Sequence, residues 1–148
     1  MYGALDISVS GMVAQRTRLN TIASNLANQN ALLEPDGGVG TYRRRVAMFA
    51  PDPGAAGGAA RGGAAGVRVA EIVEDPSPLL PVWDPTHPLA ATEDDPERGV
   101  EAGYVYYPNV NPVVEQINMI EASRAYEANV AAAEATKTML SEALRLLA

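Results

Sequence analysis

Apolar residues recur at helical spacing near both ends of this 148-residue chain, and this pattern constrains the fold more than any other feature. Near the N-terminus the recurrence is every seven residues, through Leu5, Met12, Leu19 and Leu26. This heptad spacing predicts a helix over residues 4–30 with a narrow apolar stripe. The helix would be about 40 Å long, and its stripe needs a second helix to cover it.

Residues 112–148 predict that second helix, about 55 Å long. Pro112 suits a first helical position, and Asn111 before it is a good N-cap. A series with spacings of three and four then runs along it, in which Ser123 and Lys137 are the polar members and the others are Met119, Tyr126, Val130, Ala133, Leu140, Leu144 and Leu147. We expect the two helices to pair as an antiparallel coiled-coil hairpin. Alanines on the remaining surfaces indicate that such hairpins pack sideways against one another.

The middle of the chain, residues 31–111, differs in kind, because it holds ten of the eleven prolines. An alanine- and glycine-rich stretch at 51–66 is typical of a flexible loop. Strands are predicted at 41–49, 66–75 and 103–108, which together indicate a small sheet or hairpin. The expected fold is therefore mainly α, with two long terminal helices and a small β-containing, loop-rich middle insert.

The formal charge of −7 argues against a nucleic-acid partner, which requires a basic surface. The charge divides unevenly among the three expected regions, with +1 in 1–30, −6 in 31–111 and −2 in 112–148. The chain has no cysteine, so it forms neither disulfides nor thiolate metal sites. No apolar run is long enough to span a membrane. The N-terminus lacks the features of a cleaved secretory signal, which favours the cytoplasm or an export route without one.

Two polar blocks stand out as candidate interaction sites. The segment NTIASNLANQNA, residues 20–31, carries an unusual density of amides on a helix. Its amides are interpreted either as hydrogen-bonding groups between subunits or as caps and turn formers at a solvated helix end. The second block, 108–111, is interpreted as a turn, a cap and a hinge. The full set of predicted subunit-contact residues is Leu19, Ile22, Ser24, Asn25, Leu26, Ala27, Asn28, Pro108, Asn109, Val110, Asn111, Met119, Tyr126, Val130, Leu140 and Leu144.

Other residues invite chemical interpretations that the pattern does not favour. His87 lies near Asp84 and Ser77, but proline-broken loop separates them and gives no reason to expect a positioned triad. The acidic cluster at 93–97 lacks the spacing of a calcium loop and is interpreted as a solvated charge run. The arginines at 43–45 are too few for a nucleic-acid claim. We therefore predict no enzyme, no metal and no cofactor.

Three stretches resemble the flagellar axial proteins, the family that builds the bacterial rod and hook. They are RLNTIASNLANQNA (18–31), GVRVAEIVEDPSPLLPVWDPTHPLA (66–90) and YYPNVNPVVEQINMIEASRAYEANVAAAEATKTML (106–140). The resemblance implies a structural subunit of the proximal, periplasmic rod, whose partners are further copies and other rod proteins. It also implies export, unfolded and without a cleaved signal, through the flagellar type III apparatus. Terminal helices would line the inner tube and fold only on assembly, after which the rod transmits torque.

Two other classes of protein stay open at this point. A soluble coiled-coil adaptor or chaperone of an export system would have stable helices in the dilute protein. An enzyme would lose its function when His87 or Asp84 is replaced, while assembly stayed intact. Hydrogen exchange in 4–30 and 112–148 separates the adaptor from the rod subunit.

Overall fold

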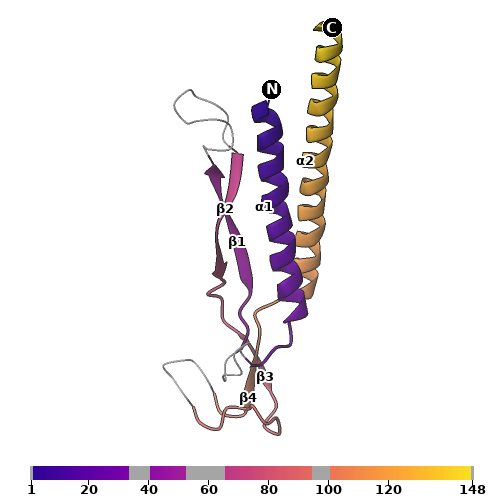
Figure 1. The fold of residues 1–148 in the computed structure, drawn as a ribbon. Helices are drawn as coiled ribbons and strands as arrows, with labels where there is room; N and C mark the ends of the chain where they lie inside the picture. The colour runs from indigo at the N-terminus through magenta and orange to yellow at the C-terminus, as the bar shows by residue number, and fades with distance from the viewer. Residues whose placement is uncertain (1, 34–40, 53–65, 95–100, 148) are drawn as a thin grey trace.

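The computed structural model of the chain describes residues 2–33, 41–52, 66–94 and 101–147. These residues form two long helices and two small two-stranded sheets, in an elongated molecule (Figure 1). The elements in chain order are α1 (Tyr2–Ala27), β1 (Arg45–Asp52), β2 (Gly66–Glu74), β3 (Leu80–Trp83), β4 (Tyr104–Tyr107) and α2 (Pro112–Leu147). The expectation of two terminal helices around a small β-containing insert is confirmed.

The two helices lie side by side, with both chain ends at the same end of the pair (Figure 1). α2 begins at Pro112 as predicted, and Asn111 caps it by accepting hydrogen bonds from the backbone N–H groups of Val113 and Val114. α1 starts at Tyr2 and ends at Ala27, rather than covering 4–30. Its C-terminal end is earlier because residues 28–30 turn away from the helix, where their amides favour non-helical backbone.

The most buried face of α1 is formed by Ile22 and by small and polar residues rather than by the leucine heptad. Gly11 meets α2 so closely that a Cβ placed on it would lie 2.7 Å from the Asn129 Oδ1 atom. Ala14 on α1 and Ala122 on α2 are buried, whereas the heptad residues are half-buried. The reason is that α1 packs against α2 and also against the β1–β2 hairpin (Figure 1). The buried positions follow both contacts rather than one stripe.

β1 and β2 form an antiparallel hairpin beside α1. The register runs from Arg45 opposite Glu74 to Asp52 opposite Gly66, and it shifts between Met48 and Phe49. This bulge adds one residue to β2 and changes its alternation, which is why a strict period of two does not extend along the strand. The predicted strand at 66–75 is confirmed, but the one at 41–49 lies at 45–52 instead. Of the predicted loop, residues 51 and 52 lie in β1 and Gly66 begins β2, whereas 53–65 lies outside the described residues.

β3 and β4 form the second hairpin, below the base of the helix pair (Figure 1). The strand predicted at 103–108 is confirmed as β4, but β3 was not predicted, and it contains Pro81, a residue type that disfavours strands. Proline is tolerated here because β3 is an edge strand of a two-stranded sheet. The ring of Trp83 packs edge-on against Tyr104, with 5.0 Å between ring centroids. This second hairpin therefore has its own small aromatic cluster.

Replacing Gly103 by alanine is expected to destabilise the β3–β4 hairpin by about 1 to 3 kcal/mol. Gly103 has a φ of +84°, and a Cβ on it would lie 2.5 Å from the Cζ3 atom of Trp83. The side chain would strain the backbone and displace the indole ring. Near-ultraviolet circular dichroism of Trp83 measures the effect, since this is the only tryptophan in the chain. An unchanged tryptophan signal in Gly103→Ala would contradict the expectation.

Candidate functional site

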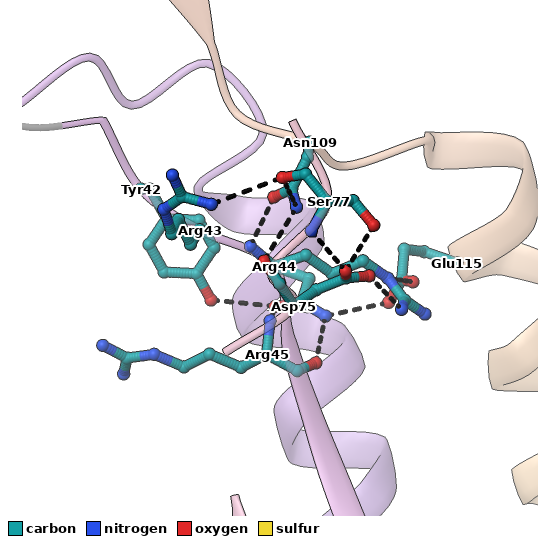
Figure 2. A network of polar contacts seen from close by, with 9 residues as sticks. Tyr42, Arg43, Arg44, Arg45, Asp75, Ser77, Asn109 and Glu115 are labelled. Carbon is teal, nitrogen blue, oxygen red and sulfur yellow. Dashed lines mark hydrogen bonds and ion pairs between the residues drawn. The ribbon is translucent and has the colours of Figure 1, made fainter. Parts of the chain in front are cut away.

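A buried polar cluster joins the end of α1 to the beginnings of α2 and β1 (Figure 2). We call it the polar junction, and it consists of Asn25, Tyr42, Arg44, Asp75, Asn109 and Glu115. Asn25 and Glu115 are both 0% exposed, and they are among the largest fully buried side chains in the described part of the chain. A junction made of an amide and a carboxylate is stable only if each polar atom has a partner.

Asn25 uses its full hydrogen-bonding capacity in this junction. Its Nδ2 atom donates to the Arg45 carbonyl oxygen at 2.8 Å and to the Glu115 Oε2 atom at 3.1 Å. Its Oδ1 atom accepts from the Tyr42 hydroxyl and from the Arg45 backbone N–H, both at 2.9 Å. One amide therefore fixes α1 to β1 and to α2, and neither water nor a ligand is needed to satisfy it.

Arg44 bridges two carboxylates that come from different elements. Its Nε atom lies 2.8 Å from the Glu115 Oε1 atom, and its Nη1 atom lies 3.2 Å from the Asp75 Oδ2 atom. Burial lowers the pKa of Arg44, but the hydrogen bonds and charges of Glu115 and Asp75 outweigh burial and raise it. The guanidinium therefore stays charged and compensates the buried carboxylate of Glu115.

Asn109 holds the strands to the segment that enters α2. Its Oδ1 atom accepts from the Arg44 backbone N–H at 2.8 Å, and its Nδ2 atom donates to the carbonyl oxygens of Asp75 and Ser77. The adjacent Val110 is buried. The block at 108–111 thus contains both an inter-segment clamp at Asn109 and the helix cap at Asn111.

The polar junction brings segments together that are far apart in the sequence, and its chemistry is structural. Each charged side chain in it has a partner of opposite charge, and each amide is bound to backbone or side-chain atoms. Among the described residues, no group of histidine, cysteine or acidic side chains is arranged to hold a metal ion. The junction joins the base of the helix pair to the start of β1 and to Asp75, which follows β2.

Asp75 gives the junction a pH dependence. Hydrogen bonds from the Ser77 hydroxyl and backbone N–H, followed by those of Arg44, hold the pKa of Asp75 below its usual value. A lowered pKa stabilises the fold above the ordinary aspartate range, and that stabilisation is lost as the pH falls through the lowered pKa. We expect Asp75→Asn to reduce the loss of stability between about pH 4 and pH 2, relative to the parent chain. Urea unfolding at several pH values measures this, and an identical acid profile would contradict it.

Apolar side chains are exposed on the helix pair itself. At the start of α2, Val113, Ile117 and Ile120 lie outside the contact with α1, and each is more than half exposed. On α1, Val9 and Val13 are also exposed. Surfaces of this kind mark interaction sites more often than isolated apolar residues do.

The predicted contact residues divide into buried, half-buried and exposed groups. Ile22, Asn25, Pro108 and Val110 are buried inside the chain. Asn28 donates its amide to the Ser24 carbonyl oxygen, as a turn former at the end of α1. The half-buried residues are Leu19, Ser24, Leu26, Asn28, Asn109, Met119, Tyr126, Val130 and Leu140. The exposed residues are Ala27, Asn111 and Leu144.

Four junction residues were not predicted from the sequence. Arg44 was read as part of a short basic patch, and Tyr42, Asp75 and Glu115 were not considered as site residues. The signal for Glu115 lies in the spacing of seven that links it to Ala122 and Asn129 on the α1-facing side of α2. The acidic residue at the buried end of such a stripe needs a cation, and the nearby arginines supply one.

Comparison with known proteins places these features in a family context. One family model, described as "Flagella basal body rod protein", matches residues 5–31. Another, described as "Flagellar basal body rod FlgEFG protein C-terminal", matches residues 101–146. The two matched segments contain most of α1 and α2.

Full-length relatives match as well. The flagellar basal-body rod protein FlgC of Borreliella burgdorferi is 39% identical over 155 residues. The FlgC proteins of Escherichia coli O157:H7 and Salmonella typhimurium are each 40% identical over 146 residues. Each of these alignments covers 99% of this chain and 97% of the relative.

Proposed function

This chain belongs to the FlgC family of flagellar basal-body rod proteins, and we propose that its terminal helices form the contacts between subunits in the rod. It is a structural subunit of the basal-body rod rather than an enzyme, and it assembles with other rod proteins. The relatives reported above are rod proteins, which does not support the alternative of an export adaptor.

The observation that carries the proposal is the exposed apolar surface on the helix pair. The exposed parts of Val113, Ile117 and Ile120 leave water only when another subunit covers them. Because about half of each side chain is already buried, covering the rest contributes about 1 to 1.5 kcal/mol per side chain. The buried face of the pair is small and polar, so the larger apolar residues of α2 are available for neighbours. In this proposal the pair forms an antiparallel coiled coil inside the rod.

We propose that three regions of the chain occupy different places in the rod. Residues 1–30 and 112–148 form the packed inner part, and residues 31–111 lie outside it. The predicted contact residues that are exposed or half-buried, such as Leu19, Ala27 and Leu144, would meet neighbouring subunits. The buried Asn25 would act indirectly, by fixing the geometry of the helix pair.

The route to the rod belongs to the same proposal. The subunit would pass unfolded through the flagellar type III apparatus, without a cleaved signal, and join the proximal part of the rod in the periplasm. Within the described residues, neither helix is apolar enough over a sufficient length to cross a membrane. After assembly, load would be shared across many small contacts between helices as the shaft transmits torque.

The test is an in-frame deletion of residues 112–148 in the source organism, followed by electron microscopy of basal bodies. We expect rings without rod or hook and no swimming, and the full-length chain should restore the rod, the hook and swimming.

A finer variant replaces Ile117 and Ile120 by asparagine, which changes the exposed surface but not the buried junction. Its matched control, Gln116→Asn, alters an exposed polar position on the same helix. Complete rods after the deletion would overturn the proposed function.

A further inference from the structure

Apolar spacing alone does not fix how the two helices are aligned along their length. Each helix carries an apolar series that repeats every seven residues. The series on α1 consists of Leu5, Met12, Leu19 and Leu26, and that on α2 of Met119, Tyr126, Ala133, Leu140 and Leu147. A shift of one helix by seven residues, about 10 Å, therefore brings apolar residues opposite one another again. The alignment must come from contacts that do not repeat.

Two contacts of this kind join α1 to α2. At the base of the pair, Asn25 binds Glu115. Nearer the chain ends, Gly11 lies against Asn129. The two contacts are two heptads apart on both helices, so they belong to the same antiparallel alignment.

The contact between Gly11 and Asn129 has room for only one side chain. A Cβ on Gly11 would lie 2.7 Å from the Oδ1 atom of Asn129, 2.9 Å from its Cγ atom and 3.0 Å from its Nδ2 atom. The Nδ2 atom also donates to the Ala125 carbonyl oxygen at 2.8 Å. Because Cγ is bonded directly to Cβ, the amide can make room only by rotating about χ1, which breaks this hydrogen bond. The two residues therefore match in size.

The shifted alignments would place a larger residue against Asn129. A movement of α1 by one heptad brings Ala4 or Arg18 to the place of Gly11. Both carry the Cβ for which the observed contact has no room. The other glycine of α1, Gly3, does not belong to this seven-residue series. A polar side chain at one position of a heptad repeat is a known way to specify alignment, and the glycine opposite it adds a steric requirement.

We propose that Gly11 and Asn129 are positioning residues, which set the alignment and the separation of the helices for assembly in the rod. Asn129 lies about 21 Å along α2 from Glu115, so the polar junction does not hold the helices at this height. Val9 and Val13, which are exposed on α1, keep their places relative to α2 only while the contact holds. The inference rests on the proposed function, since it names residues that shape the surface used between subunits.

A double-variant cycle in the purified full-length chain tests the contact. Gly11→Ala adds a methyl group against the amide of Asn129 and should raise the equilibrium constant for unfolding. In the Asn129→Ala background the amide is absent, so Gly11→Ala should lower that constant through the higher helix propensity of alanine. The two effects of Gly11→Ala should differ at least about tenfold, and urea unfolding measures them.

Gly3→Ala is the matched control for this cycle. It makes the same chemical change on the same helix, but away from Asn129, so its effect should be equal in the two backgrounds. Equal effects of Gly11→Ala in the two backgrounds would overturn the inference.

An exchange of the two residues tests whether assembly uses the contact. In the source organism, Gly11→Asn should abolish rods and swimming, because two amides cannot occupy one contact. Combining it with Asn129→Gly restores one amide and one glycine, which should recover both. A role in local helix stability alone predicts the opposite order, since the combined chain carries two changes that disfavour helices. Ala4→Asn, at an exposed position of the same helix, is the matched control and should leave rods intact.

The results separate this inference from the proposed function. Intact rods in Gly11→Asn would overturn the inference, and so would an exchanged chain that recovers neither its helical circular dichroism nor its rods. In both cases the loss of rods on deletion of 112–148 would leave the proposed function standing. If that deletion leaves rods intact, the proposed function fails, and the unfolding cycle still decides whether Gly11 and Asn129 position the helices.

Discussion

Asn25→Asp is expected to lower the free energy of unfolding by about 3 to 5 kcal/mol, although the two side chains have nearly the same shape. The substitution removes the donor that binds the Arg45 carbonyl oxygen and the Glu115 carboxylate. It also places a second carboxylate where the amide lay, 3.1 Å from the Glu115 Oε2 atom. Two buried like charges at this distance cannot both be compensated by Arg44. Urea unfolding followed by far-ultraviolet circular dichroism measures the loss.

Asn20→Asp is the matched control for this prediction. Asn20 lies on the same helix but is exposed, so the same chemical change should alter the free energy of unfolding by no more than about 0.5 kcal/mol. The penalty of Asn25→Asp should also shrink as the pH is lowered, because one proton shared between the two carboxylates removes their repulsion. Equal losses in the two variants would mean that the amide of Asn25 does not have a special role.

The helices could be predicted from the sequence because their signals are local. Pro112 and Asn111 set the start of α2 through groups within one turn, and the prediction held to the residue. The end of α1 was predicted less well. The amides at 28–30 support a turn as readily as a helix, so apolar spacing alone extends the helix beyond Ala27.

The polar junction could not be predicted, because its contacts join residues far apart in the sequence. Asn25 and Glu115 are 90 positions apart, and nothing in either local pattern identifies the partner. The density of amides near Asn25 did point to a polar environment. Two interpretations were considered, contacts between subunits and caps at a solvated end. Asn28 takes the second role, whereas Asn25 is buried inside its own chain, which is a third role.

Arg44 and Arg45 are neighbours in the sequence, but their side chains contribute differently to the polar junction. Arg44 lies directly before β1, whose first residue is Arg45, and of the two side chains only that of Arg44 contacts the junction carboxylates. Arg44 is 23% exposed and contacts Glu115 at 2.8 Å, whereas Arg45 is 44% exposed and contacts Glu74 at 3.5 Å. The backbone of Arg45, however, binds Asn25 through both its N–H and its carbonyl group. Side-chain and backbone roles are thus divided between two neighbours.

Arg44→Met is therefore expected to lower the free energy of unfolding by about 3 to 5 kcal/mol, because it leaves Glu115 buried without its cation. Arg45→Met keeps the backbone contacts and removes an exposed ion pair with Glu74 and a cation–π contact in which the guanidinium lies 5.6 Å from the centre of the Tyr42 ring. Its expected cost is therefore smaller, about 0.5 to 1.5 kcal/mol. Urea unfolding of the two variants compares the free energy of unfolding after the same substitution at two neighbouring arginines. Similar costs for both would contradict the assignment of Arg44 as the cation of the junction.

A double-variant cycle separates the ion pair from the packing of the arginine stem. If most of the cost of Arg44→Met comes from the uncompensated charge of Glu115, Glu115→Gln should remove part of it, since the neutral amide does not need a cation. The combined variant is then more stable than the sum of the two single losses implies, by about 1 to 3 kcal/mol. Additive losses would show that Arg44 contributes through its apolar stem instead. In that case, shape rather than charge would hold the base of the helix pair against β1.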